Sequence, residues 1–168
     1  FFVSVRYKAE MIKAHFGDGS RWGVEVRYLS ETDRLGTAGA LSLLPERPLV
    51  PFIVMNGDVL TNANFNALLD AHTERTPGAT TCVREYEFTV PYGVAKLDGS
   101  RLVSIEEKPA HRFFVNAGIY VMEPKVLDFI APNEAVDMPS VLHRLVANGS
   151  NVNAYPILEY WQDIGRGE

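Results

Sequence analysis

Cysteine is almost missing from this chain of 168 residues, in which Cys82 is the single example. One cysteine excludes an intrachain disulfide and any zinc site built from several thiolates, and it favours a reducing compartment. The histidines lack the close spacing that zinc sites use; they are His15, His72, His111 and His143. We therefore expect neither disulfides nor structural zinc to stabilise this protein.

Long apolar runs and clusters of positive charge are missing as well. No apolar run reaches the length of about 18 residues that a membrane span requires, and no basic segment leads into an apolar one at the N-terminus. The formal net charge is −5 and the sequence pI is near 5.4, which argues against a protein that binds a nucleic-acid backbone. We expect a cytoplasmic protein with no nucleic-acid partner and no membrane partner.

The composition that remains is that of a folded protein. Hydrophobic residues make up 46% of the chain and charged residues 22%, and a chain of this length buries a substantial core. No repeat, low-complexity tract or interdomain linker is visible, so we predict one domain over residues 1–168. The chain opens on the β-prone run FFVSV and not on an initiator methionine, and we expect further sequence upstream.

Apolar β-prone runs and amphipathic segments alternate through the first half of the chain. Strands are predicted at residues 1–5, 23–29, 51–56 and 78–86, and helices at 7–16, 37–44 and 64–75. Asn62 or Asn64 is the expected N-cap of the last of these helices. The alternation predicts an α/β protein with a Rossmann-like, mostly parallel sheet flanked by helices. Residues 51–56 are expected to form a strand that is buried on both faces.

The second half departs from this alternation. Two strands are predicted within residues 92–109, around the turn Asp98-Gly99, and a further strand at 113–122. Short helical segments are predicted at 124–130 and 139–149, and extended segments at 151–157 and 159–165. These elements predict a small mixed β insertion beside the main sheet.

Asp58 is the first candidate for chemistry, in the stretch VMNGDVLT (residues 54–61). Ligands in open parallel sheets bind beyond the carboxyl ends of the strands, which is where Asn56, Gly57 and Asp58 fall. A carboxylate at that place is suited to a divalent cation that bridges phosphate oxygens. Aspartate is also a common residue in turns and helix caps, so both roles stay open on position alone.

Three further motifs place polar groups at the ends of predicted elements. LGTAGA (residues 35–40) has two glycines at a helix start, where free amides receive an anion or a flat base. SIEEKP (104–109) sets Glu107 beside Lys108, a pair suited to hydroxyls and phosphate or, alternatively, to a solvated turn. YWQDIG (160–165) places Asp163 at a strand end, where a second carboxylate could complete a metal site with Asp58, although the spacing alone does not show that the two residues meet.

In order along the chain, six motifs resemble those of the sugar-nucleotide pyrophosphorylases, the nucleotidyltransferases that activate sugar 1-phosphates. They are LGTAGA, VMNGDVLT, PYGVAKLDG, SIEEKP, VNAGIYV and YWQDIG. The sequence is most similar to the mannose-1-phosphate guanylyltransferase-like branch, whose bacterial members include some with regulatory CBS domains ahead of the catalytic domain. The resemblance implies Mg²⁺-dependent transfer of a nucleotidyl group from an NTP to a sugar 1-phosphate, giving an NDP-sugar and pyrophosphate, and it allows a homo-oligomer.

The same resemblance implies roles for individual residues. Asp58 and Asp163 would ligate Mg²⁺, and Lys108 would contact the sugar phosphate. Glu107 and Asn116 would bind sugar hydroxyls, while glycine would let the backbone approach the sugar at positions 93 and 118 (Gly93 and Gly118). The nucleotide site would be lined by Gly36, Thr37, Asn56 and Gly57.

Glu31 bears on the choice of base. Relatives that read uracil or thymine carry a glutamine at the position of Glu31. A carboxylate accepts hydrogen bonds only, and guanine offers two adjacent donors where uracil offers one. The resemblance therefore predicts GTP as the favoured nucleotide.

One feature of the family is not found in this sequence, namely the opening strand with a glycine-rich loop of the type GGxGTRLxPLT. Residues 1–5 would correspond to a later strand, so about one βαβ unit of 30 or more residues is expected to be absent, and this segment alone to be inactive. Two alternatives stay open. One is a non-catalytic regulatory relative that binds sugar nucleotides; the other is a metal-dependent glycosyltransferase, although the DxD motif of such enzymes does not occur here.

Overall fold

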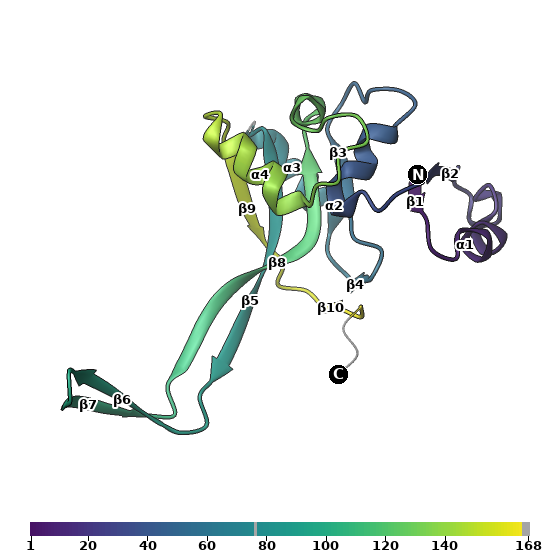
Figure 1. The fold of residues 1–168 in the computed structure, drawn as a ribbon. Helices are drawn as coiled ribbons and strands as arrows, with labels where there is room; N and C mark the ends of the chain where they lie inside the picture. Colours follow the sequence, from purple (N-terminus) through teal and green to yellow (C-terminus); the bar gives the residue numbers. More distant parts are fainter. Residues whose placement is uncertain (76, 166–168) are drawn as a thin grey trace.

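A four-stranded sheet forms the centre of the computed structural model, which describes residues 1–75 and 77–165. Its strands lie in the order β3 (Phe52–Met55), β8 (Ala110–Met122), β5 (Ala79–Thr89) and β9 (Val152–Pro156) (Figure 1). β8 runs antiparallel to both β3 and β5, and β5 runs parallel to β9. Three strands thus share one direction, and the predicted α/β class is confirmed with one reversed strand inside the sheet.

Helices cover both faces of this sheet. The side chains of β8 alternate between the two faces, so each face carries apolar side chains on which a helix packs. Tyr120 and Met122 join a core cluster with α4 (Met138–Ala147) and the 3₁₀ segment η3 (Pro124–Phe129). Ile119 and Val121 join the opposite cluster, which includes Leu68 of α3 (Phe65–Arg75). The central strand of the core is therefore β8, whose segment from Ala117 to Met122 is fully buried.

β3 is less buried than its sequence predicts. Ile53 is 36% exposed and Met55 39% exposed, so the expectation of a strand buried on both faces is wrong. The physical reason is that β3 lies at the edge of the four-stranded sheet, with β8 as its hydrogen-bonded neighbour. The helix that follows agrees better with prediction, since the amide of Ala67 donates to Oδ1 of Asn64 at 3.1 Å, which makes Asn64 its N-terminal cap.

A second, two-stranded sheet pairs β1 (Phe2–Val5) in parallel with β2 (Arg27–Ser30). The connection contains α1 (Ala9–Phe16) and the 3₁₀ turn η1 (Ser20–Trp22), and this unit lies to one side of the main sheet (Figure 1). β2 starts later than predicted because the amides of Val24 and Val26 bond to the carbonyl oxygens of Gly19 and Asp18 in a loop. The predicted helix at 37–44 is a single turn, α2 (Gly36–Gly39), continued by the 3₁₀ segment η2 (Ala40–Leu43).

A third pair joins β4 (Val59–Thr61) antiparallel to β10 (Trp161–Asp163). β10 is one of the predicted extended segments, whereas β4 has no counterpart in the sequence-based prediction. This pair brings the stretch after Asp58 beside the C-terminal motif.

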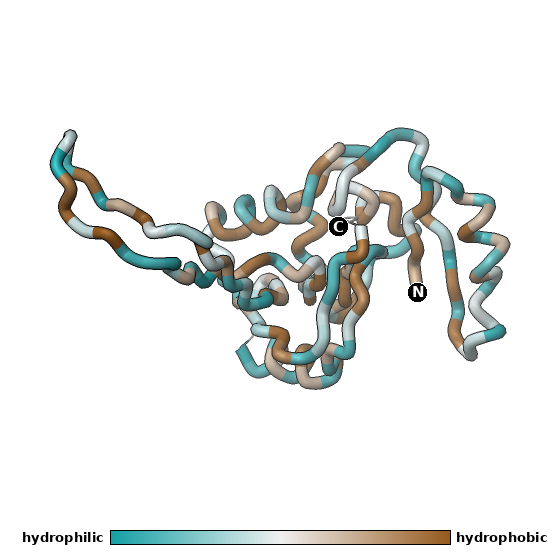
Figure 2. Tube along the Cα trace, turned by 90° about the horizontal axis from the view of Figure 1, so that it is seen from below, coloured by the Kyte–Doolittle hydropathy of each residue, from teal (hydrophilic) through white to brown (hydrophobic). Residues whose placement is uncertain are grey.

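The mixed β insertion is a long arm, residues 85–114, that extends away from the helices and the main sheet (Figure 1). The outer halves of β5 and β8 lead into the hairpin of β6 (Gly93–Asp98) and β7 (Arg101–Glu107), in which Asp98 pairs with Arg101 as the Asp98-Gly99 turn predicts. Every residue of β6 and β7 is exposed. Apolar and polar residues alternate along the arm (Figure 2). Among the helices of the described residues, none is long and apolar enough to cross a membrane.

Candidate functional site

Asp58 and Asp163 lie together at the carboxyl end of β3. Asp163 is paired with Val59 across the β4–β10 ladder, and the amide of Ile164 donates to the carbonyl oxygen of Asp58 at 2.9 Å. A Cβ atom built on Gly165 would lie 3.1 Å from Cγ of Asp58 and 3.3 Å from Oδ1 of Asp163. The two carboxylates therefore converge on the same small space, which the backbone of a glycine leaves open.

β10 is held in place by contacts on both sides. The indole nitrogen of Trp161 donates to the carbonyl oxygen of Ala117 at 2.8 Å, and Oγ1 of Thr61 donates to the carbonyl oxygen of Tyr160 at 2.8 Å. Trp161 also packs on the core cluster that contains Ala117 and Ile119. The position of Asp163 is thus fixed by the core of the protein and not by the chain terminus alone.

Asn56, Asn116 and Gly118 form a polar cluster next to the aspartates. The amide of Asn56 donates to the carbonyl oxygen of Gly118 at 2.8 Å. The amide of Gly118 donates to Oδ1 of Asn116 at 3.0 Å, and Nδ2 of Asn116 donates to the hydroxyl of Tyr120 at 2.7 Å. Three residues expected to touch substrates are therefore joined in one network at the same end of the sheet as Asp58.

Glu31 accepts hydrogen bonds from two nearby residues. The hydroxyl of Ser4 donates to Oε1 of Glu31, and the amide of Leu35 donates to its Oε2 at 3.0 Å. The carboxylate thereby fixes the loop that leads from β2 into α2. It retains further lone pairs, because a carboxylate accepts about four hydrogen bonds.

Several amides of LGTAGA already have hydrogen-bond partners in this structure. The amide of Thr37 donates to Oδ1 of Asp137 at 2.9 Å, and the amides of Ala38 and Gly39 both donate to the carbonyl oxygen of Val136, at 3.0 and 3.1 Å. Asp137 is a residue that sequence reasoning missed. The signal was the stretch DMPS, an aspartate followed by proline in the first turn of α4, which is typical of a helix N-terminus.

Gly93, Glu107 and Lys108 lie at the base of the β6–β7 hairpin. Gly93 pairs with Glu107, and the amide of Lys108 donates to the carbonyl oxygen of Tyr92 at 3.3 Å. These residues are exposed. The extended strand from Ala110 to Asn116 spans about 20 Å, so the structure brings the hairpin residues together but does not bring them to the aspartates.

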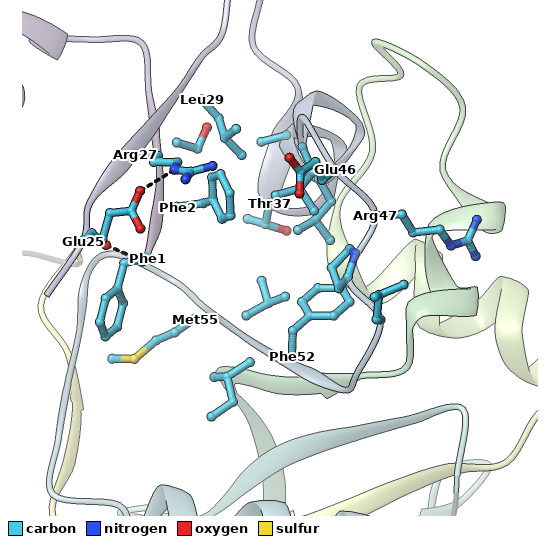
Figure 3. Close-up of a pocket in the computed structure, with 18 residues that line it drawn as sticks. Phe1, Phe2, Glu25, Arg27, Leu29, Thr37, Glu46, Arg47, Phe52 and Met55 are labelled. Atoms are coloured by element: carbon cyan, nitrogen blue, oxygen red, sulfur yellow. Dashed lines mark hydrogen bonds and ion pairs between the residues drawn. The ribbon is translucent and has the colours of Figure 1, made fainter. Parts of the chain in front are cut away.

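A separate cleft of about 680 Å³ lies between the β1–β2 pair and β3 (Figure 3). It is named here the β1–β3 cleft, and Phe2, Leu29, Leu41, Leu44 and Phe52 are among the residues that line it. Thr37 also lines it, whereas Asp58 and Asp163 do not. The apolar cleft and the acidic pair are therefore two distinct features.

Two further observations describe the groups that the described residues provide. Within residues 1–75 and 77–165, no group of three or more histidine, cysteine, aspartate or glutamate side chains is placed to hold a metal ion. Burial raises the pKa of the Cys82 thiol to about 12, so Cys82 is not a nucleophile at neutral pH. The site offers two carboxylates and a set of amide groups, which suit the positioning of phosphates rather than covalent catalysis.

Comparison with known proteins agrees with the resemblance of the motifs. The mannose-1-phosphate guanylyltransferase of Mycobacterium tuberculosis is 32% identical over 99% of this chain and 48% of its own length. The UTP–glucose-1-phosphate uridylyltransferase of Synechocystis sp. is 31% identical over 98% of this chain and 47% of its own length. The chain thus spans about half the length of the curated relatives that it matches.

Solved structures share the fold. A putative glucose-1-phosphate thymidylyltransferase from Bacillus anthracis superposes with a TM-score of 0.72 at 20% identity, covering 98% of this chain and 70% of that one. The family model described as nucleotidyl transferase matches residues 1–168. This chain is therefore a member of the nucleotidyl transferase family.

Proposed function

We propose that this chain belongs to an enzyme that transfers a nucleotidyl group from an NTP to a sugar 1-phosphate and releases pyrophosphate. The observation that carries this proposal is the convergence of Asp58 and Asp163 at the carboxyl end of β3. The names of the relatives, which include guanylyl and uridylyl transferases for sugar 1-phosphates, support it. The alternative of a non-catalytic regulatory relative has no comparable support.

The two aspartates fit a magnesium site. Mg²⁺ in phosphate-transfer enzymes is commonly held by one or two carboxylates, with phosphate oxygens and water as the other ligands. Asp58 and Asp163 provide that number of carboxylates, and Gly165 leaves the space between them open. When bound there, Mg²⁺ would offset negative charge on the phosphates.

The reaction asks the protein to align two polyanions. A phosphate oxygen of the sugar 1-phosphate attacks the α-phosphorus of the NTP in line, the bond to the β-phosphate oxygen breaks, and pyrophosphate leaves. Asn56 and Gly57 are proposed to orient the nucleotide phosphates from the turn after β3. Asn116 and Gly118 are proposed to bind the sugar.

From the arm, Lys108 is proposed to contact the sugar phosphate, Glu107 to bind sugar hydroxyls, and Gly93 to let the backbone approach the sugar. Since the arm extends away from the aspartates, this role requires the arm to bend toward the main sheet when substrate binds. Lys108 has a backbone φ of 47°, a conformation that is uncommon outside glycine. It lies where the direction of the chain changes between β7 and β8.

GTP is proposed as the favoured nucleotide, with Gly36 and Thr37 near the base and Glu31 as an acceptor for guanine. Several relatives are named as guanylyltransferases, which supports this choice. Comparable turnover with UTP, or unchanged GTP preference in Glu31→Gln, would refute the base assignment without refuting the transferase reaction. A cytoplasmic location, a homo-oligomer and upstream CBS domains remain predictions.

The transferase proposal is tested with the natural polypeptide that contains residues 1–168. It is incubated with Mg²⁺, each of the four NTPs and a panel of sugar 1-phosphates, and pyrophosphate release is measured. Asp58→Asn is expected to lower activity by at least about a hundredfold because it removes a carboxylate where the metal is held. Asp70→Asn, a matched change on the exposed side of α3, is expected to keep normal activity. If the folded protein releases no pyrophosphate with any combination of NTP and sugar 1-phosphate, the proposal is contradicted.

A further inference from the structure

The inner part of the arm, in which the outer halves of β5 and β8 pair, has two unlike faces. It is named here the shaft and consists of residues 85–89 and 110–114. Residues that lie opposite each other in an antiparallel ladder share one face, as do alternate residues of a strand. Four rings therefore form an aromatic face of the shaft. The ladder joins them as Tyr86 with Phe113 and Phe88 with His111.

The opposite face of the shaft is mainly charged. On this face the ladder pairs Glu85 with Phe114 and Glu87 with Arg112. Nε of Arg112 lies 2.9 Å from Oε2 of Glu87 and 3.6 Å from Oε1 of Glu85, and all three side chains are exposed. Burial of these charges in an interface would cost free energy. The charged face is therefore suited to water, and the aromatic face is suited to being covered.

The hairpin of β6 and β7 beyond the shaft shows the same division. On one side, the ladder pairs Ala95 with Ile105 and, after a shift of one residue, Leu97 with Leu102. The other side is mostly polar, with the pairs Lys96–Ser104 and Asp98–Arg101. An antiparallel ribbon with one apolar side and one polar side is typical of a ribbon that packs on another surface. The arm is thus divided in this way in both of its parts.

Large apolar side chains on these two apolar faces are only half covered. Six of them are between 50% and 63% exposed, namely Tyr86, Phe88, Leu97, Leu102, Ile105 and Phe113. The arm extends away from the helices and the main sheet (Figures 1 and 2), so the body of the chain does not cover them. Large exposed apolar patches on soluble proteins commonly mark sites of protein interaction.

The area of these side chains suits the association of two copies of this chain. A large side chain that is about half exposed offers about 100 Å² of surface. Two copies of the six side chains therefore provide on the order of 1,200 Å², and a specific protein interface buries about 1,200–2,000 Å² in total. The arm alone offers the apolar surface that a dimer of this chain needs.

The charge of the arm also permits two copies to approach each other. Residues 85–114 contain four lysine and arginine residues and five aspartate and glutamate residues, so the arm carries −1 of the formal net charge of −5. The excess negative charge thus lies on the rest of the chain. Because like charges repel over distances of about 10 Å, a nearly neutral arm is the part of this chain on which two copies repel each other least.

We propose that the arm packs against the arm of a second copy of this chain, with the aromatic face of the shaft and the apolar side of the hairpin buried between the two copies. The two arms would be related by a twofold axis, since a surface that is the same on both copies then covers itself. The ion pairs of Arg112 would remain on the outside. The proposal concerns the arm as it lies without substrate, and it does not rest on the transferase reaction.

Sedimentation of the natural polypeptide that contains residues 1–168, measured over a series of concentrations, tests the proposal. The unchanged protein is expected to form a dimer. Phe113→Glu is expected to raise the dissociation constant of the dimer at least about a hundredfold, because each copy would then bury an unpaired charge. Phe114→Glu is the matched control, since Phe114 is the next residue and is also exposed but lies on the charged face. It should change the dissociation constant by less than about threefold.

Hydroxyl-radical labelling of Tyr86 and Phe88 shows what covers the aromatic face. If a second copy covers it, labelling falls as the protein concentration rises. Labelling that is low at every concentration would assign the cover to the polypeptide's own chain, and labelling that falls only when another protein is added would assign it to that protein. Either result overturns the proposal. So does a protein that sediments as a monomer at every concentration, or an association that the two variants lower equally or that Phe113→Glu leaves unchanged.

Discussion

The indole nitrogen of Trp161 donates a 2.8 Å hydrogen bond to the carbonyl oxygen of Ala117. This bond links the strand that carries Asp163 to the central strand that carries Asn116 and Gly118. The side chain of Trp161 therefore links the proposed metal site to the proposed sugar site.

Trp161→Phe should loosen this connection while keeping an aromatic ring in the core. Loss of the indole donor is expected to cost about 1–2 kcal/mol in the free energy of unfolding. It should also raise the Mg²⁺ concentration for half-maximal activity about tenfold, because residues behind a metal ligand orient it. Urea unfolding and a Mg²⁺ titration measure the two effects. Tyr160→Phe, at the exposed neighbouring position, is the control, and an equal change in that variant would contradict the role of Trp161.

Gly118→Ala should damage both the fold and the site. Gly118 has a φ of 70°, and a Cβ built on it would lie 2.8 Å from Nδ2 of Asn56. The backbone strain and the clash together are expected to cost about 2–3 kcal/mol. Gly99→Ala provides a matched control, since Gly99 has a φ of 60° and no atom within 4 Å of the built Cβ. It should lose about 1 kcal/mol. Equal losses in the two variants would mean that the contact with Asn56 has no energetic effect.

Much of the fold follows from local patterns in the sequence. The apolar run before Asn56 predicts β3, the helical spacing after Asn64 predicts α3, and the Asp98-Gly99 turn predicts the hairpin of β6 and β7. Each of these signals lies within a few residues along the chain. β4 escaped prediction because three residues, Val59–Thr61, are too short a stretch to show an alternating pattern.

What the sequence could not show depends on contacts between distant segments. Thr37 and Asp137 are 100 residues apart, and their hydrogen bond occupies an amide that LGTAGA alone presents as free. The exposed edge of β3 also could not be predicted from nearby residues. The apolar residues of β3 specify a strand, but they do not specify how many strands pair with it. Likewise, the Asp98-Gly99 turn of the arm is specified by neighbouring residues, whereas the extension of the arm away from the main sheet depends on contacts between distant segments. The convergence of Asp58 and Asp163 was expected from the ordered motifs, and the structure brings the two residues together.

Cys82 should be unreactive in the folded protein. It is fully buried beside Leu68 and Ile119, and burial raises the pKa of its thiol to about 12. At pH 8 we expect a disulfide reagent to label the native protein at least about a hundredfold more slowly than the protein in denaturant. Labelling is followed by absorbance or mass spectrometry. A native thiol that reacts as fast as a free cysteine would show that the core around β5 opens readily.

Glu134 should make the stability of the α4 region depend on pH. The guanidinium of Arg144 donates to both carboxylate oxygens of Glu134, and the amide of Ala131 donates to one of them at 3.0 Å. The hydrogen bond from Arg144 is the main reason why the pKa of Glu134 falls from 4.5 to about 2.

The direction of the effect follows from that shift. Because the folded pKa lies below the unfolded one, the interaction stabilises the protein fully above about pH 4.5 and is lost as the pH falls toward 2. Glu134→Gln should therefore be less stable than the unchanged protein at pH 6, and the difference should shrink steadily between pH 4.5 and the acid limit of folding. Urea midpoints measured at several pH values test this expectation. A difference that stays constant over that range would mean that Arg144 does not stabilise the charged form of Glu134.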